Sequence, residues 1–298
     1  MKLRVLSDLH VDINNRYMPN RSLRLEGDVF TLIAGDTADS PKKAIDWIQK
    51  NIQNGLVIAG NHIVYSGDKR ALQDLKLQLA QAFPPDSPIT FLDHMTGVMH
   101  KEVDNILFIG TTLYTDYSLL PDVSVREAML HSCRRSGLMD FRTGYTQDQG
   151  RLRHITPLDY SRWFTESLQE ITRLVEANPQ KEIVLLTHHC PSARCCSDYY
   201  GILNAAFASN LEPFITAHPN IKLWVAGHTH HRKNFKIGNC LVLLNPRGYE
   251  HIGQGLGFNP NTFVDTSDWS VRQSPLKTNP KEDKAVMDEL LKQACLTL

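Results

Sequence analysis

Short runs of apolar residues recur along the chain, and each run is four to six residues long. They are rich in Val, Ile and Leu, and adjacent positions within a run are both apolar. This pattern is typical of strands that are covered on both faces of a sheet. The runs are Leu3–Leu6, Val29–Ala34, Leu56–Ala59, Ile106–Ile109, Ile183–Leu186, Leu223–Ala226 and Leu241–Leu244.

Amphipathic segments lie between several of these runs. Ser40–Pro41 and Thr156–Pro157 each place a hydroxyl side chain before a proline, which is a signal for the start of a helix. Residues 68–83 and 201–218 also have helical spacing. Strands that alternate with helices predict an α/β fold in which the strands lie between helical layers.

Two stretches depart from this pattern. Residues 114–155 hold a weak helix over about 122–136 and then a polar, basic run, so we expect an insertion that leaves the sheet between two strands. The prediction is one large domain over residues 1–267. The remaining segment, 268–298, turns polar and is expected to carry a short amphipathic helix over 281–295.

Composition narrows the class of protein. Among 298 residues the basic and acidic side chains balance, and this zero net charge disfavours a long nucleic-acid track. The six cysteines form no C-x-x-C pair, so we expect reduced thiols and a cytoplasmic protein. No apolar run approaches the roughly 18 residues of a membrane helix, so no membrane partner is expected.

Chemistry-bearing side chains follow five of the predicted strands, often directly after a glycine. They are Asp8, His10, Asp36, Asn61, His62, His188, His189, His228 and His230. Because ligands collect at the carboxyl ends of strands in open α/β sheets, we expect these side chains to converge. The i, i+2 spacing of Asp8/His10 and of His228/His230 predicts that each pair shares one side of an extended backbone. The glycines, Gly227 among them, are expected to turn the chain at the sheet edge.

The composition of this set indicates metal chemistry. Apart from His62 and one histidine of the His188–His189 pair, the set holds two carboxylates, one amide oxygen and four imidazoles. These exceed one tetrahedral zinc site and suit two metal ions that share a bridging carboxylate. Such ions lie roughly 3.5–4 Å apart and favour hydrolysis of phosphate esters. Mixed nitrogen and oxygen ligands admit Mn, Fe, Zn, Co or Ni. Position along the strand favours His188 over His189 as a ligand, and a shift of one residue would exchange them.

Taken in order, these motifs resemble those of the calcineurin-like metallophosphoesterases. The matching segments are Asp8-x-His10, Gly35-Asp36, Gly60-Asn61-His62, His188 and Gly227-His228-x-His230. Residues 110–117, 203–212 and 245–249 look like one bacterial and phage-type branch of that superfamily. The resemblance implies a four-layer αββα sandwich with the site on one edge. One position departs from the family pattern, because Ile63 stands where an Asp or Glu usually follows the histidine.

The resemblance also implies a role for each residue. The first metal would take Asp8, His10 and His230, and the second would take Asn61, His188 and His228. Asp36 would bridge the two ions, a hydroxide held between them would attack phosphorus, and His62 would stand beside the leaving group. The implied activity is hydrolysis of mono- or diesters in a phosphorylated small molecule or a nucleotide-like substrate. The alternatives are a nuclease and a non-catalytic, metal-stabilised binding module.

Four other residues bear on the same site. Arg247, directly after a predicted strand, and Arg142, in the insertion, are candidates for contacts with the phosphate. Asp39 is expected to serve the start of the helix at Pro41 and not the site. His231 is expected to point away from the metals, at the surface or behind the ligands.

Overall fold

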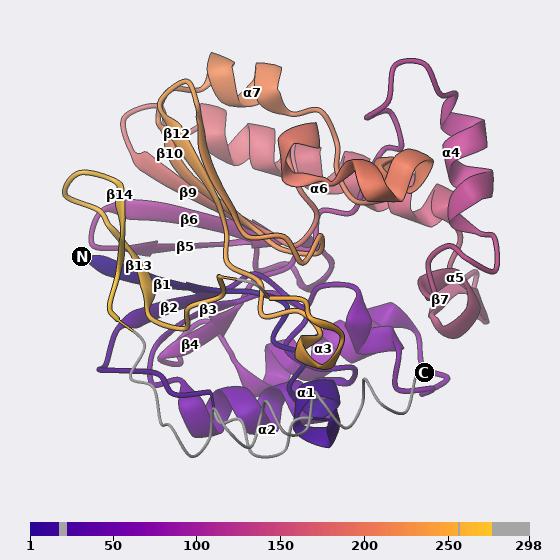
Figure 1. The fold of residues 1–298 in the computed structure, drawn as a ribbon, viewed down its shortest axis with the longest axis horizontal. Coiled ribbons are helices and arrows are strands. Elements are labelled where there is room, and N and C mark those ends of the chain that lie inside the picture. Colours follow the sequence, from indigo (N-terminus) through magenta and orange to yellow (C-terminus); the bar gives the residue numbers. More distant parts are fainter. Residues whose placement is uncertain (18–22, 256, 276–298) are drawn as a thin grey trace.

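Two six-stranded sheets form the centre of the molecule. The computed structural model describes residues 1–17, 23–255 and 257–275. The strand orders are β14-β13-β1-β2-β3-β4 and β11-β12-β10-β9-β6-β5. Helices cover the outer face of each sheet, which gives four layers (Figure 1). The predicted α/β sandwich is confirmed.

The first sheet has a parallel centre and an antiparallel edge. Its parallel strands are β1 (Lys2–Leu6), β2 (Phe30–Ile33), β3 (Gly55–Val57) and β4 (Ile89–Phe91). The antiparallel edge strands are β13 (Thr262–Asp265) and β14 (Ser270–Gln273). Helices α1 (Val11–Tyr17), α2 (Pro41–Asn51) and α3 (Leu72–Ala82) lie below this sheet in Figure 1.

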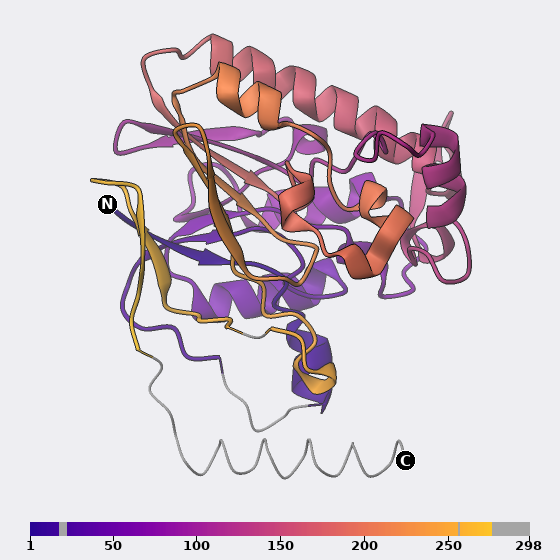
Figure 2. The same ribbon diagram turned by 45° about the horizontal axis from the view of Figure 1, so that its top comes forward.

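The second sheet repeats the plan, with antiparallel strands at both edges. Its parallel strands are β6 (Ile106–Thr111), β9 (Glu182–Thr187), β10 (Ile221–Ala226) and β12 (Cys240–Leu244). The edge strands are β5 (His100–Val103) and β11 (Lys233–Ile237). Helices α6 (Pro157–Glu176) and α7 (Glu212–Ala217) run side by side over its outer face (Figure 2).

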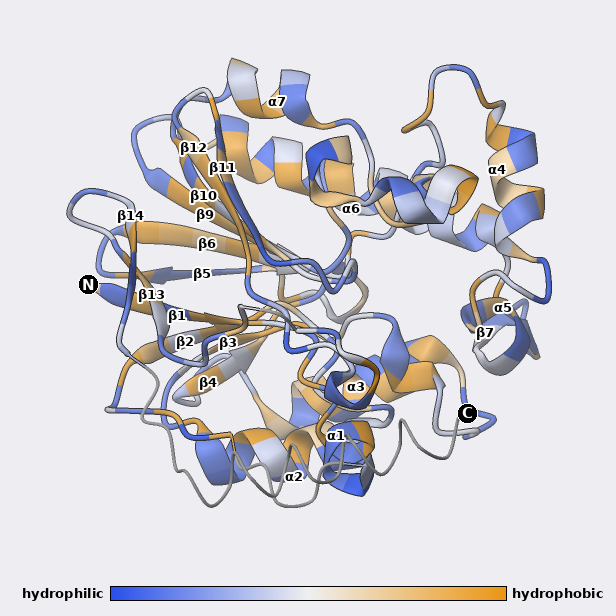
Figure 3. Ribbon diagram, viewed as in Figure 1, coloured by the Kyte–Doolittle hydropathy of each residue, from blue (hydrophilic) through white to orange (hydrophobic). Residues whose placement is uncertain are grey.

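Strand alternation explains why the runs are apolar throughout. Leu3 and Val5 of β1 pack with Val184 and Leu186 of β9 in the layer between the two sheets. The intervening positions, such as Leu6, belong to the larger cluster that includes the helices. Since successive side chains of a strand point to opposite faces, each strand needs apolar residues at every position. Figure 3 shows the resulting apolar strands in both sheets.

The two predicted helix starts are present. The Ser40 side chain accepts a hydrogen bond from the backbone of Lys43, and Thr156 forms a capping box with Asp159. The helical spacing over 201–218 does not give one helix. The chain forms a 3-10 segment, η4 (Asp198–Ala206), with a left-handed kink at Gly201, and then the short α7. The remaining 3-10 helices are η1 (His62–Val64), η2 (His94–Thr96), η3 (Ala193–Cys195) and η5 (Glu250–Ile252).

The insertion predicted at 114–155 projects to one side of the sandwich (Figure 1). It contains α4 (Val125–Ser132), α5 (Asp140–Thr143) and a two-stranded hairpin, β7 (Tyr145–Asp148) with β8 (Arg151–His154). The polar, basic run of the insertion thus pairs with itself as a hairpin. At the other end, β14 extends the first sheet beyond the predicted boundary at 267.

The helix expected over 281–295 lies outside the described residues. Within residues 1–17, 23–255 and 257–275, no helix combines the length and apolarity needed to cross a membrane.

Candidate metal centre and active site

The site lies where the carboxyl ends of the parallel strands of both sheets meet. Strands β1, β2 and β3 of one sheet lead to Asp8, Asp36 and Asn61, and β9 and β10 of the other lead to His188 and His228. Backbone hydrogen bonds join the connecting segments, such as Asp8 N–H to Gly35 C=O at 3.1 Å and Gly227 N–H to His188 C=O at 3.0 Å. The expected convergence therefore occurs, and it spans two sheets.

The backbone is left-handed at five of the seven predicted ligands. The φ angles are 49° at Asp8, 40° at His10, 53° at Asp36, 69° at His228 and 55° at His230. The expectation that each i, i+2 pair lies along an extended backbone is therefore wrong. A non-glycine residue in this region costs of order 1 kcal/mol or more, and such conformations persist where the surroundings hold them. Here the Asp8 carboxylate accepts a hydrogen bond from the backbone of His228 at 2.8 Å.

Two glycines of the site are required because another segment of the chain passes close to each of them. A Cβ on Gly60, whose φ is 78°, would lie 2.1 Å from Asp36 Oδ1. A Cβ on Gly227 would lie 2.6 Å from Asp8 Oδ2. The chain turns here, since Thr229 N–H donates to Gly227 C=O at 2.8 Å, but Gly227 does not have a positive φ, so the turn itself does not require a glycine. Gly227 is needed because a side chain there would displace the Asp8 carboxylate.

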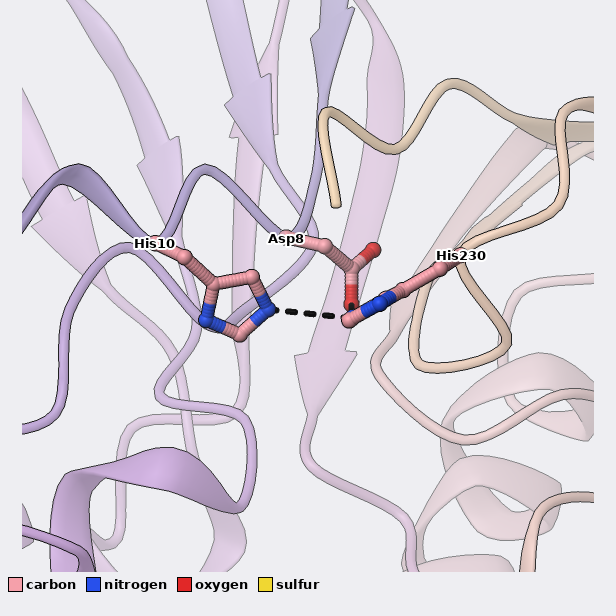
Figure 4. Close-up of side chains that lie close together, drawn as sticks. All are labelled: Asp8, His10 and His230. Carbon is pink, nitrogen blue, oxygen red and sulfur yellow. Dashed lines mark hydrogen bonds and ion pairs between the residues drawn. The ribbon is translucent and has the colours of Figure 1, made fainter. Parts of the chain in front are cut away.

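One donor group consists of Asp8, His10 and His230, whose donor atoms all lie within 4.8 Å of one another (Figure 4). His10 Nε2 is 3.0 Å from His230 Nε2, which is 3.5 Å from Asp8 Oδ1. His230 Nδ1 is 2.5 Å from Gln254 Oε1. Because this amide oxygen only accepts, Nδ1 carries the hydrogen and the Nε2 lone pair faces the group.

A second donor group consists of Asp36, His188 and His228. His188 Nε2 is 3.1 Å from Asp36 Oδ2 and 3.2 Å from His228 Nδ1. Asn61 joins this group, since its Oδ1 lies 2.9 Å from His188 Nε2 and 3.0 Å from His228 Nδ1. The three ligands predicted for each ion thus lie beside one another, and Asp36, the predicted bridge, lies with the second group.

The structure also separates His188 from His189. His188 Nδ1 is 2.8 Å from the carbonyl oxygen of Ala34, so Nδ1 carries the hydrogen and the Nε2 lone pair faces the second group. His189 Nδ1 lies 3.3 Å from the carbonyl of Thr112, and its ring stacks on that of His228 with centroids 4.3 Å apart. His188 is therefore the one in the donor group, as its position along the strand favours.

Buried atoms without partners show that these residues fit metal ions. Asp8 Oδ2 and Asp36 Oδ2 are buried and accept no hydrogen bond, which is costly unless a cation compensates them. Nitrogen and oxygen ligands about 2.0–2.2 Å from one ion lie roughly 3–3.5 Å from one another, and the observed spacings match. Burial also holds the pKa of His10 and of His228 well below the usual value, so both present neutral imidazoles.

A third cluster lies next to these groups and contains His62. Its Nδ1 is 2.9 Å from Asp39 Oδ1, and its Nε2 is 3.2 Å from the Tyr249 hydroxyl and 3.8 Å from Asp36 Oδ2. The expectation that Asp39 serves the helix start is wrong, because Ser40 caps α2 and the Asp39 carboxylate turns to His62. Burial lowers the pKa of His62, but Asp36 and Asp39 outweigh it and raise the pKa.

Asp39 also resolves the departure at Ile63. That side chain is 1% exposed and belongs to the core. The carboxylate absent after the histidine is thus supplied from the segment between β2 and α2. The sequence carries a signal for this, since Asp39 follows Asp36 by three residues, but a carboxylate just before a helix is equally typical of a cap.

Sequence reasoning missed three further residues of the site. Tyr249 places its ring 4.6 Å from that of His10 and 4.8 Å from that of His230. Gln254 orients His230, and Asp140 of α5 accepts a hydrogen bond from the Asn61 amide at 3.0 Å. No local pattern identifies them, because each reaches the site from a loop or from the insertion.

The two arginines proposed for substrate contacts have other partners. Arg247 is 2% exposed, and its guanidinium pairs with Glu250 at 2.9 Å. Arg142 is exposed and donates to the carbonyl of Arg135 at 2.7 Å. Their roles toward a substrate stay predictions. His231, assigned no ligand role, is half-buried and belongs to neither donor group.

The comparison with protein families decides the class. The profile described as Calcineurin-like phosphoesterase matches residues 1–232, more than half of the chain. The chain belongs to the calcineurin-like phosphoesterase family. Membership in this family, together with the Asp and His groups, supports a metal-binding phosphoester hydrolase.

Two relatives of this calcineurin-like phosphoesterase cover nearly all of it. An uncharacterized protein of Acanthamoeba polyphaga mimivirus is 26% identical over 286 residues, which are 88% of this chain and 96% of that protein. The crystal structure of the phosphopantetheinyl hydrolase of Mycobacterium tuberculosis is similar with a TM-score of 0.67 and 16% identity. The match covers 94% of this chain and 97% of that one. At 16% identity, this structural similarity is evidence for the fold alone.

Proposed function

We propose that this chain hydrolyses phosphate mono- or diesters with two metal ions, one in each donor group. The observation that carries the proposal is the pair of adjacent groups, Asp8/His10/His230 and Asp36/His188/His228, beside the His62–Asp39 pair. When bound, the ions would neutralise the phosphate oxygens and lower the pKa of a water from 15.7 to about 7. Asp36 Oδ2 lies 3.1 Å from His188 Nε2 of one group, and the Asp36 charge acts on His10 of the other, which supports a bridging role.

The chain's own residues would control the proton at the leaving group. Asp39 accepts from His62 Nδ1, which fixes the ring and leaves Nε2 toward Tyr249 and Asp36. Burial lowers the His62 pKa, but Asp36 and Asp39 outweigh burial and raise this pKa above its usual value. The imidazole can therefore hold a proton for the departing oxygen. A positioned general acid of this kind contributes roughly 10²–10⁴-fold to a rate.

The proposed substrate is a phosphorylated small molecule or a nucleotide-like compound. The zero net charge of the chain supports this class over nucleic acid, because binding along a phosphate backbone needs a positive surface. Metals from the series Mn, Fe, Zn, Co and Ni suit the mixed donors, and availability decides among them.

The test is hydrolysis of p-nitrophenyl phosphate and bis(p-nitrophenyl) phosphate by the metal-free protein reloaded with each metal in turn. Activity should need the metal, and the ratio of the two rates assigns monoester or diester preference. Asp36→Asn should lower kcat by several orders of magnitude while the circular dichroism spectrum persists. Full metal-dependent turnover by Asp36→Asn would refute the mechanism.

The alternatives give different outcomes. Binding of a single-stranded oligonucleotide that falls steeply with salt, together with its cleavage, would make the protein a nuclease. Two tightly bound metal ions with no turnover of either nitrophenyl ester would favour a metal-stabilised binding module.

A further inference from the structure

A buried carboxylate ties the insertion to the metal centre. Asp140, the first residue of α5, is 1% exposed. Its Oδ1 accepts from Asn61 Nδ2 at 3.0 Å and from the Tyr160 hydroxyl, and its Oδ2 accepts from the Tyr65 hydroxyl. These three donors are neutral groups. Asn61 directly precedes η1, Tyr65 directly follows it, and Tyr160 lies in α6. A buried carboxylate is costly, so its retention there calls for a reason.

The chemistry of the Asn61 amide gives that reason. A carboxamide has an oxygen that can bind a metal and a nitrogen that cannot, and a rotation of the amide exchanges them. An ionised carboxylate only accepts hydrogen bonds, so Asp140 requires the nitrogen on its side. The oxygen must then face the opposite way, where it lies 2.9 Å from His188 Nε2 and 3.0 Å from His228 Nδ1.

The same hydrogen bond strengthens the oxygen as a ligand. Donation from the amide N–H to a charged acceptor draws electron density toward the carbonyl oxygen, because hydrogen bonds in a low-dielectric interior polarise one another. Groups that orient metal ligands in this way typically alter metal affinity or activity by about 10–100-fold.

We propose that Asp140 is a positioning residue that holds the Asn61 amide with its oxygen toward the His188–His228 group. The insertion thereby sets the metal affinity of that group. The inference rests on the proposed function only in so far as that group binds a metal. It assigns a task to the insertion, which otherwise lies to the side of the sandwich.

The first test is calorimetric titration of the metal-free, full-length protein with Mn²⁺. Asp140→Asn should weaken one of two binding events by about 10–100-fold and leave the other unchanged. The new amide can donate as well as accept, so it no longer dictates the orientation of Asn61. Equal Mn²⁺ affinities in Asp140→Asn and the wild-type protein would overturn the proposal.

A matched control separates positioning from packing. Tyr160→Phe removes another hydrogen bond to Asp140 and leaves its contact with Asn61. Tyr65 offers no such control, because its hydroxyl also accepts a hydrogen bond from Asn61 Nδ2 at 3.4 Å. We expect Tyr160→Phe to keep Mn²⁺ affinity within about threefold of wild type, whatever its effect on the melting temperature of the metal-free protein. If it weakens the same binding event as much as Asp140→Asn does, Asp140 acts through packing and the proposal fails.

The sharpest test exchanges the amide and the carboxylate between positions 61 and 140. Asn61→Asp alone places two carboxylates against each other and should weaken metal binding. The double variant Asn61→Asp/Asp140→Asn restores one donor and one acceptor in the reverse order, with an oxygen again toward the metal. It should bind Mn²⁺ more tightly than Asn61→Asp. A double variant that is weaker than both single variants would overturn the proposal.

These readouts do not depend on turnover. A weakened second Mn²⁺ site in Asp140→Asn, combined with no hydrolysis of nitrophenyl esters by the wild-type protein, supports the positioning role and refutes the proposed function. Hydrolysis by the wild-type protein, combined with an unchanged second Mn²⁺ site in Asp140→Asn, supports the proposed function and refutes the positioning role.

Discussion

The carboxylate of Asp39 lies 2.9 Å from Nδ1 of His62, although the two residues follow different strands of the first sheet. The contact places a buried imidazole between an acceptor at one nitrogen and the metal-site residues at the other. A histidine held in this way has one tautomer and one ring orientation when neutral, and a stabilised charge when protonated.

Loss of the Asp39 charge should therefore impair the leaving-group step. We expect Asp39→Asn to lower kcat by roughly 10–100-fold, since general acid catalysis is worth about 10²–10⁴-fold in total. The loss should be larger for phenyl phosphate than for p-nitrophenyl phosphate, whose leaving group needs less protonation. Steady-state rates with both esters check this, and equal losses would contradict an acid role for His62.

The control for that variant is the neighbouring helix cap. Ser40→Ala removes the side-chain acceptor of α2 and should cost about 1 kcal/mol of stability. Its kcat should be unchanged, which separates the helix start from the site.

The hydroxyl of Tyr249 should contribute to turnover. Tyr249→Phe keeps the ring against His10 and His230 and removes the hydrogen bond to His62 Nε2. One such bond is worth about 1 kcal/mol, so kcat/KM should fall roughly fivefold to tenfold. Metal content should stay at the wild-type value. Tyr17→Phe, in which the altered ring is 41% exposed, is the matched control and should be neutral. An unaltered kcat/KM in Tyr249→Phe would show that the hydroxyl is a bystander.

The three histidines of 228–231 should differ in their effect on metal content. His228 and His230 belong to different donor groups, whereas His231 belongs to neither. His228→Ala and His230→Ala should each lose about one ion per chain, because each removes a ligand. His231→Ala should retain both, because His231 supplies no ligand atom to either group. Metal analysis after dialysis measures this directly. Equal losses in all three variants would mean that the assignment of donors is wrong.

Stability should depend on pH through Asp159 at the start of α6. Burial raises the pKa of this carboxyl, but hydrogen bonds from Arg153 and Thr156 outweigh it and lower the pKa. A carboxyl with a lower pKa in the folded state stabilises the fold above its unfolded value, about 3.9. This stabilisation disappears as the pH falls through the folded pKa.

Asp159→Asn should therefore cost about 1 kcal/mol at pH 7, comparable to the loss of a helix cap. The difference from wild type should shrink below about pH 4, where the carboxyl of the unfolded chain takes up a proton, and should be lost once the pH falls below the lower pKa of the folded state. Urea unfolding across this pH range measures both effects. Asp148→Asn, which alters an exposed partner of the same arginine, should have little effect at any pH. A constant difference between Asp159→Asn and wild type would exclude the charge as the cause.

Much of the fold could be read from the chain. The seven apolar runs became β1, β2, β3, β6, β9, β10 and β12, because a strand between two apolar layers must be apolar at each position. The edge strands, such as β5 and β11, escaped detection. Their exposed faces are polar, so they lack a continuous run.

The sequence by itself determined which residues form the donor groups. Asp8, His10, Asp36, Asn61, His188, His228 and His230 stand at strand ends, and strand ends of one polarity meet in space. Only the tertiary structure decided how these residues face one another. It gave the left-handed backbone at five of them and the close approach at Gly227, neither of which local spacing predicts.

Tertiary structure alone also selected the residues behind the ligands. Asp39, Asp140, Tyr249 and Gln254 come from a loop, the insertion and the segment after β12. Each is ordinary in its local sequence, and each acquires its task from a partner far along the chain, as Asp140 does from Asn61, 79 residues away. A ligand can be recognised by its own chemistry, but a residue that orients a ligand is defined by contact. Contact between distant segments exists only once the two sheets have packed.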